Sequence, residues 1–81
     1  MSSEKEIVCS QTYGQKAVGL SFNPSGSNEV DICKKGFADL IDQMEVLRKN
    51  SANDECQRLC SIAITEMQSA QMWAVKALTW R

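Results

Sequence analysis

The sequence predicts a mainly α-helical protein: an antiparallel helical hairpin with a short N-terminal extended arm, assembling into a homo-oligomer. Three observations favour this fold class. The stretch from Ser51 to Arg81 contains no proline and no glycine. Apolar residues between Glu29 and Lys49 recur three and four positions apart, as on one face of a helix. The chain has 81 residues, so its single core is only marginally stabilising, and oligomerisation is a common remedy.

The N-terminal arm, residues 1–22, precedes a hairpin over residues 23–81, and the two form a single domain. Within the arm, residues 7–22 (IVCSQTYGQKAVGLSF) mix apolar and small polar side chains with glycines. Periodicity does not choose between an extended arm and one or two short strands. Because so short a segment cannot form a stable sheet alone, we expect it to lie on the helices or to pair with a neighbouring subunit.

The hairpin begins with a dense turn signal, residues 23–28 (NPSGSN). Ser27 or Asn28 is a suitable N-cap for the next helix, which we expect from Glu29 to about Lys49. Its apolar positions are Val30, Cys33, Phe37, Leu40, Ile41, Met44 and Leu47. The connection that follows, residues 50–53, is short, so the second helix must return antiparallel to the first.

The second helix is expected from Ser51 onward, where Ser51 and Asp54 form an S-x-x-D pair, a weaker form of the capping box. One side of it is apolar or small apart from Glu66: Leu59, Ile62, Ala63, Ala70, Trp73, Ala77 and Trp80. A second apolar stripe lies beside the first: Cys60, Ile64, Met67, Val75 and Leu78. Together the stripes are wider than the roughly 100° face that one packed partner covers. We therefore expect contacts with other chains, with the two tryptophans as anchors.

The charge pattern argues against several classes of partner. A formal net charge of −1 disfavours a binder of DNA or RNA polymers, and it disfavours a membrane-surface helix, which would carry a basic face. No apolar run is long enough to span a membrane. The N-terminus, MSSEKEIV, lacks the basic start and apolar run of a signal peptide. We therefore expect a cytosolic protein with no membrane partner.

The residue types that most enzymes and metal sites need are scarce. There is no histidine, so no Ser-His or Cys-His pair can form. The four cysteines, Cys9, Cys33, Cys56 and Cys60, lack the spacing and the further ligands of a zinc site. They are interpreted as reduced thiols that act as small hydrophobes. The sequence therefore predicts no catalytic residue, no metal and no cofactor.

The stretch from Phe22 to Lys35 combines an aromatic ring, a polar turn, a helix N-terminus and two lysines. A helix start suits phosphate, Lys34 and Lys35 can reach an anion, and Phe22 or Tyr13 could stack on a base. The alternative is a capped helix with solvated lysines and one core phenylalanine, and spacing alone favours that alternative. Arg58 is interpreted first as a salt-bridge partner of a neighbouring carboxylate and second as a phosphate contact.

Three strings in this region resemble a known family. They are FNPSG (residues 22–26), the V-x-I-x-K spacing of Val30, Ile32 and Lys34, and AITEMQSAQMWAVKALTW (residues 63–80). They resemble the helical hairpin of phage cyclic-oligonucleotide sponges, namely the anti-CBASS sponge of the second type and the first Thoeris anti-defence protein. The resemblance covers about residues 22–80, and the C-terminal string is its more specific part.

The resemblance implies a homohexamer with pockets between protomers, which captures a host immune signal without chemistry in the cytoplasm of an infected bacterium. The implied ligands are cyclic dinucleotides such as cyclic GMP-AMP, with cyclic trinucleotides or cyclic ADP-ribose derivatives as alternatives. The candidate ligand-binding residues are Phe22, Asn23, Lys34, Lys35, Tyr13 and Arg58. Phe22 takes the role of the stacking aromatic and Lys34 that of the phosphate-holding lysine. Some relatives bind trinucleotides through an arginine of the last helix, where Ile64 stands here.

Two other functions remain open from the sequence. A small helical protein could inhibit a host protein by direct contact through its wide apolar stripes, and it would not need Lys34. A signal-degrading enzyme is the second alternative, and the absence of histidine counts against it.

Overall fold

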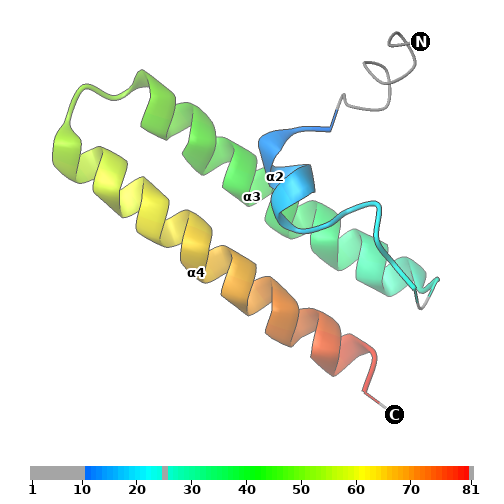
Figure 1. Ribbon diagram of the computed structural model, residues 1–81. Helices are drawn as coiled ribbons and strands as arrows, with labels where there is room; N and C mark the ends of the chain where they lie inside the picture. Colours follow the sequence, from blue (N-terminus) through cyan, green and yellow to red (C-terminus); the bar gives the residue numbers. More distant parts are fainter. Residues whose placement is uncertain (1–10, 25, 81) are drawn as a thin grey trace, which may run out of the picture.

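The computed structural model describes residues 11–24 and 26–80, and within these ranges it is helical without strands (Figure 1). A short helix, α2 (Tyr13–Ala17), lies across the long helix α3 (Asn28–Asn50). A second long helix, α4 (Asp54–Leu78), runs back antiparallel beside α3. The predicted hairpin is therefore confirmed. Its open end brings together the beginning of α3 and the end of α4 (Figure 1).

The expectation of strands or an extended arm over residues 7–22 is wrong for α2. Thr12 is its N-cap, with Oγ1 accepting from the Gln15 N–H at 3.1 Å. Gln15 Oε1 in turn accepts from the Thr12 N–H at 3.0 Å, which completes a reciprocal capping box. These two bonds stabilise a helix of five residues. Such a helix is too short for apolar residues to show a helical period. The part of the expected arm over residues 1–10 lies outside the described residues.

Gly14 lets α2 pack closely against α3. Its N–H donates to Asp42 Oδ1 at 2.6 Å. A Cβ added at Gly14 would lie 2.1 Å from the Ala38 carbonyl oxygen and 2.8 Å from Asp42 Oδ1. Only a residue without a side chain fits there, so this glycine fixes where α2 sits on α3.

The core joins all three helices. Its buried members are Val18, Ala38, Ile41 and Ile64, and its partly buried members are Ala17, Leu20, Phe37, Met44 and Met67. On α3 the fully buried positions differ from the predicted stripe, because Leu40 and Leu47 are 51% and 45% exposed. Lys34 is buried on the inner face of α3 together with Val30, Ala38 and Ile41, so this face is partly polar.

The helix ends agree with the predicted turns, with one change. Ser27 is the N-cap of α3, as expected. At α4 the capping residue is Asn53 and not the Ser51–Asp54 pair, because Asn53 Oδ1 accepts from the Cys56 N–H at 2.9 Å.

Cys60 lies buried on α4, and burial, with Cys56 beside it, raises the pKa of its thiol. Cys33, Cys56 and Cys60 are free thiols. Cys9 lies outside the described residues.

Arg48 ties the two long helices together near the closed end. Its Nη1 donates to Ser61 Oγ on α4 at 3.0 Å, and its Nη2 pairs with Glu45. The guanidinium also lies 5.7 Å from the centre of the Tyr13 ring on α2. Hydrogen bonds to Tyr13 and Glu45 raise the pKa of Arg48, and the bond from Arg48 lowers the pKa of Glu45.

No helix among the described residues is long and apolar enough to cross a membrane.

Gly14→Ala is expected to lower the free energy of unfolding by about 1–3 kcal/mol, because overpacking would push α2 off α3. Urea unfolding followed by far-UV circular dichroism measures the loss. Gly36→Ala is the matched control, because a Cβ at Gly36 meets no atom within 4 Å. That change should stabilise α3 by about 0.5–1 kcal/mol, the helix preference of alanine over glycine. Equal effects of the two substitutions would contradict the close α2–α3 contact.

Glu45→Gln tests whether the ion pair between Glu45 and Arg48 stabilises the fold, and how that stabilisation depends on pH. The folded state lowers the pKa of Glu45 below its usual value of 4.5. The carboxylate therefore stabilises the fold above that value, and this contribution is lost as the pH falls through the lowered pKa. The melting temperature of wild type should be higher than that of Glu45→Gln at neutral pH. The difference between the two melting temperatures should disappear at acid pH. A gap that stays constant down to acid pH would show that the ionic pairing contributes nothing.

Candidate functional site

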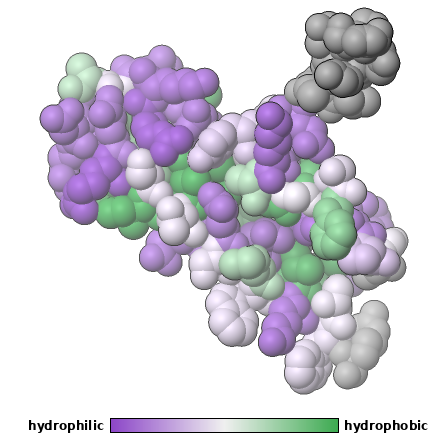
Figure 2. All heavy atoms as spheres, in the orientation of Figure 1, coloured by the Kyte–Doolittle hydropathy of each residue, from purple (hydrophilic) through white to green (hydrophobic). Residues whose placement is uncertain are grey.

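A cavity of about 340 Å³ lies at the open end of the hairpin. The loop before α3, the first turns of α3 and the last turns of α4 each supply part of its lining: Phe22, Asn23, Pro24, Val30, Lys34, Val75 and Thr79. Hydrophobic residues reach the surface towards this end, whereas hydrophilic residues cover the closed end (Figure 2). The cavity therefore combines apolar walls with a few polar groups, as small-molecule sites commonly do.

Lys34 is the positive group of this cavity. Its side chain is buried, with 5% of the residue exposed. The ammonium donates to the Gly19 carbonyl oxygen at 3.1 Å and to the Phe22 carbonyl oxygen. An ammonium has three N–H donors, so one donor remains for a further acceptor in the cavity. The interpretation of Lys34 as a solvated lysine is therefore wrong, because the loop folds back over it.

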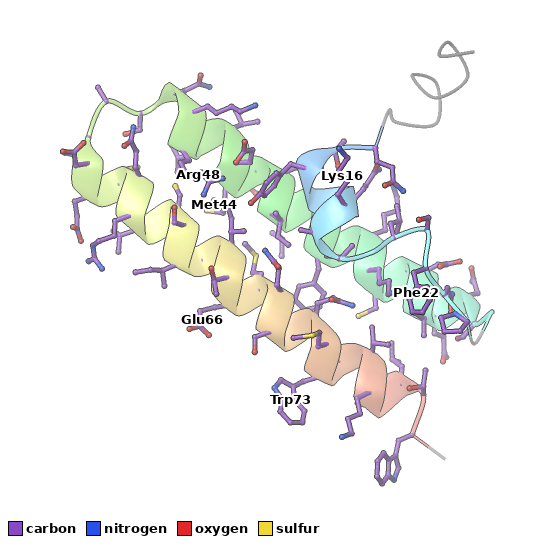
Figure 3. The ribbon with its side chains drawn as sticks, in the orientation of Figure 1. Lys16, Phe22, Met44, Arg48, Glu66 and Trp73 are labelled. Atoms are coloured by element: carbon purple, nitrogen blue, oxygen red, sulfur yellow. The ribbon has the colours of Figure 1, made fainter. Side chains whose placement is uncertain are left out.

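Phe22 projects from the loop beside the beginning of α3 (Figure 3). Its residue is 69% exposed, and the Lys34 ammonium lies 5.6 Å from the centre of its ring. The Phe22 N–H donates to the Gly19 carbonyl at 2.9 Å across a turn in which Gly19 has φ 65°. The alternative of a core phenylalanine is therefore wrong. An exposed ring beside a buried cation offers a stacking surface next to an anion-binding group.

Asn23 lines the cavity, but its amide group is engaged within the loop. Its Oδ1 accepts from the Gly26 N–H at 3.1 Å. Its Nδ2 donates to the Ser27 carbonyl at 2.8 Å and to Asp31 Oδ1 at 2.9 Å. Asn23 thus connects the loop to the first turn of α3.

The other three candidates lie elsewhere. Lys35 is exposed on α3 and does not line the cavity. Tyr13 contacts Arg48, which is fourteen residues, or about 21 Å of helix, from Lys34. Arg58 pairs with Glu55 near the start of α4, with N–O distances of 2.6 and 3.0 Å, so its predicted salt bridge is confirmed. Figure 3 shows Arg48 far from Phe22.

Arg58 also borders a second, shallower hollow along α4. The hollow is lined by Arg58, Ser61, Ile62, Thr65 and Glu66. All five belong to one helix, and no described part of the protein closes over them from above. This hollow contains neither a stacking ring nor a buried cation. The cavity of Phe22 and Lys34 is therefore the better candidate site.

Sequence reasoning missed the α4 wall of the cavity. Val75 was placed in an apolar stripe, and Thr79 was not singled out. The Thr79 hydroxyl donates to the Val75 carbonyl at 2.8 Å, so this residue presents its methyl group or an acceptor oxygen to the cavity. The V-x-x-x-T spacing was visible, but only the antiparallel register brings it opposite Lys34.

Comparison with known proteins shows to which family the chain belongs. No curated protein and no solved structure matches the chain at a significant level. A family model described as the Acb2/Tad1 hairpin domain matches residues 15–79, which include the whole hairpin and every residue that lines the cavity. The resemblance inferred from the three strings is thereby confirmed. This chain belongs to the Acb2/Tad1 hairpin family of phage anti-CBASS and anti-Thoeris sponge proteins.

Proposed function

We propose that this protein is a phage anti-defence sponge that binds cyclic dinucleotides, or a related cyclic nucleotide signal, and holds them without degrading them. The observation that carries the proposal is the exposed Phe22 ring beside the buried Lys34 ammonium in a cavity of about 340 Å³. Membership of a family associated with anti-defence sponges supports it. The proposed ligands are cyclic dinucleotides such as cyclic GMP-AMP, with cyclic trinucleotides and cyclic ADP-ribose derivatives as alternatives.

The cavity residues divide the work of binding. A base would stack on Phe22, and a ring phosphate would accept a hydrogen bond from the remaining N–H of Lys34. Val30, Val75 and Pro24 would pack against the apolar face of the base that Phe22 leaves open. Among the described residues, the cavity of one protomer has one aromatic ring and one cation, whereas a cyclic dinucleotide has two bases and two phosphates. We therefore infer that a second protomer completes the site, as the family resemblance implies.

Binding alone is sufficient for the proposed activity. A nanomolar site corresponds to about −12 kcal/mol, and it keeps the free signal below the concentration that an effector needs when protein is in excess. Such affinity for a small dianion requires stacking and charge-assisted hydrogen bonds in a preorganised pocket. We place this activity in the cytoplasm of the infected bacterium, where the signal is made.

The outer face of α4 supports a homo-oligomer, for which we propose a hexamer. Residues at alternating spacings of three and four follow this face: Leu59, Ile62, Glu66, Ser69, Trp73, Lys76 and Trp80. This is the heptad spacing of helices that pack together. Trp73 and Trp80 are 67% and 71% exposed, and Figure 3 shows Trp73 and Glu66 pointing away from α3. Exposed tryptophans gathered on one helix face favour an interface with another chain.

The same exposed face also supports the rival function, direct inhibition of a host protein. In that case the tryptophans would contact the host partner, and Lys34 would serve the fold alone. One experiment separates the functions. The protein is incubated separately with cyclic GMP-AMP, a cyclic trinucleotide and a cyclic ADP-ribose derivative. The unbound fraction is separated, the protein is denatured by heat, and the nucleotides in the unbound and the released fractions are analysed by chromatography. Intact nucleotide supports the sponge and an altered nucleotide an enzyme. No depletion of any cyclic signal refutes both.

Phe22→Ala is expected to weaken binding of the cyclic dinucleotide by about 1–3 kcal/mol, the worth of one stacked base. Because the ring is exposed, the melting temperature should hardly change. Lys34→Ala should weaken binding by at least roughly 1.5–3 kcal/mol and also lower the melting temperature, because two loop carbonyls lose a charged donor. Calorimetry and a melting curve measure both effects.

Lys49→Ala is the control for Lys34→Ala, since Lys49 lies on the same helix at its far end and is mostly exposed. It should bind as wild type does. Wild-type affinity in both Phe22→Ala and Lys34→Ala would move the ligand away from this cavity.

Trp73→Asp is expected to dissociate the oligomer into single chains, because burial of a carboxylate without a partner between subunits is costly. Light scattering should give several times the mass of one chain for wild type and for Trp73→Phe, and the mass of one chain for Trp73→Asp. A wild-type protein that is monomeric at micromolar concentration would contradict the assembly.

A further inference from the structure

We infer that Asn23 and Asp31 are positioning residues, which hold the loop before α3 so that Phe22 is presented at the cavity. The inference rests on the proposed binding function, and it changes the role of Asn23 from ligand contact to loop clamp. The Phe22 ring has little packing of its own, because the residue is 69% exposed. Its place must therefore be set by the backbone on either side of it.

The Asn23 amide spans the turn and reaches the helix. Its Oδ1 accepts from the Gly26 N–H, which also donates to the Asn23 backbone carbonyl, each at 3.1 Å. Gly26 has φ 68°, a left-handed conformation that glycine adopts without strain. At its other end, Nδ2 donates to the Ser27 carbonyl at 2.8 Å and to Asp31 Oδ1 at 2.9 Å. An amide supplies both an acceptor and two donors, and this position uses all of them.

The loop is thereby fixed to α3 at two points. Lys34 binds the Phe22 carbonyl, and Asp31, one helical turn earlier, binds the Asn23 side chain. Phe22 and Asn23 are adjacent, so the two attachments hold the peptide unit between them. Asp31 does not line the cavity, and its effect on a ligand must pass through Asn23.

This arrangement lowers the entropic cost of binding. A free loop would have to become ordered when the base stacks on Phe22, and that ordering would subtract from the affinity. A loop already held at two points loses less freedom.

An exchange of the two side chains tests the clamp. Asn23→Asp removes both donors and places two carboxylates together, so affinity for cyclic GMP-AMP should fall about tenfold or more. Adding Asp31→Asn restores a donor–acceptor pair in the opposite direction, and most of the affinity should return. The double variant has the net charge of wild type.

Glu29→Gln in the Asn23→Asp background is the matched control. It makes the same charge change in the first turn of α3 but restores no bond to residue 23. Rescue by Asp31→Asn and not by Glu29→Gln supports the clamp. Equal rescue by both, or rescue by neither, overturns it, because Asn23 would then act through charge or by touching the ligand itself.

A second measurement needs no ligand. In Asn23→Ala, amide hydrogen exchange should accelerate at Phe22 as well as at Gly26, although the Phe22 N–H bonds to Gly19 and not to Asn23. The Ile64 amide in the core of α4 should keep its protection. Faster exchange at Gly26 alone overturns the inference. If wild type binds no cyclic nucleotide, the proposed function fails, and this result still decides whether Asn23 holds Phe22 in place.

Discussion

The Lys34 ammonium lies between α3 and the loop that precedes it, bound to the carbonyl oxygens of Gly19 and Phe22. A buried charge is tolerated in a protein only when polar groups replace its water. The loop carbonyls meet that demand, and in doing so they draw residues 19–22 down onto α3. The exposed ring of Phe22 and the cavity beneath it follow from this contact. The same group thus anchors the loop and, among the described residues, supplies the positive charge that lines the cavity.

The hairpin places its rigid and its functional parts at different ends. Near the closed end, Arg48 joins α2, α3 and α4 through Tyr13, Glu45 and Ser61. In the middle, Gly14 lets α2 settle against the backbone of α3. At the open end, the hydrogen bonds of Lys34 and Asn23 hold the loop against α3. The cavity at this end is therefore separate from the buried core cluster, whose members do not line it.

The two faces of α4 differ in what they contact. The inner face buries Cys60, Ile64 and Gln71 against the rest of the protomer. The outer face leaves Trp73 and Trp80 in solvent. A core of this size is marginal, and burial of the outer face between copies would add the missing apolar contacts. The end of α4 also forms a wall of the cavity through Val75 and Thr79, so the proposed assembly face and the candidate site lie on one helix.

The sequence by itself determined the two long helices, their antiparallel pairing and the family. Apolar spacing, the turn at residues 23–28 and the short connection are local signals, and local signals fix local structure. The pairing of Phe22 with Lys34 was also accessible, through resemblance. Only the tertiary structure showed that residues 13–17 form a helix, that Lys34 is buried, that Phe22 is exposed and that the Asn23 amide bonds to Asp31. The burial of Lys34 and the exposure of Phe22 depend on how the loop, twelve to fifteen residues before Lys34 in the chain, packs on α3. The capping box of α2 and the bonds of Asn23 join residues that are closer in the chain, but the sequence pattern does not show which of the possible partners they use. The physical reason is that propensity acts over a few residues, whereas burial of a charge or a ring is set by which distant backbone atoms pack around it.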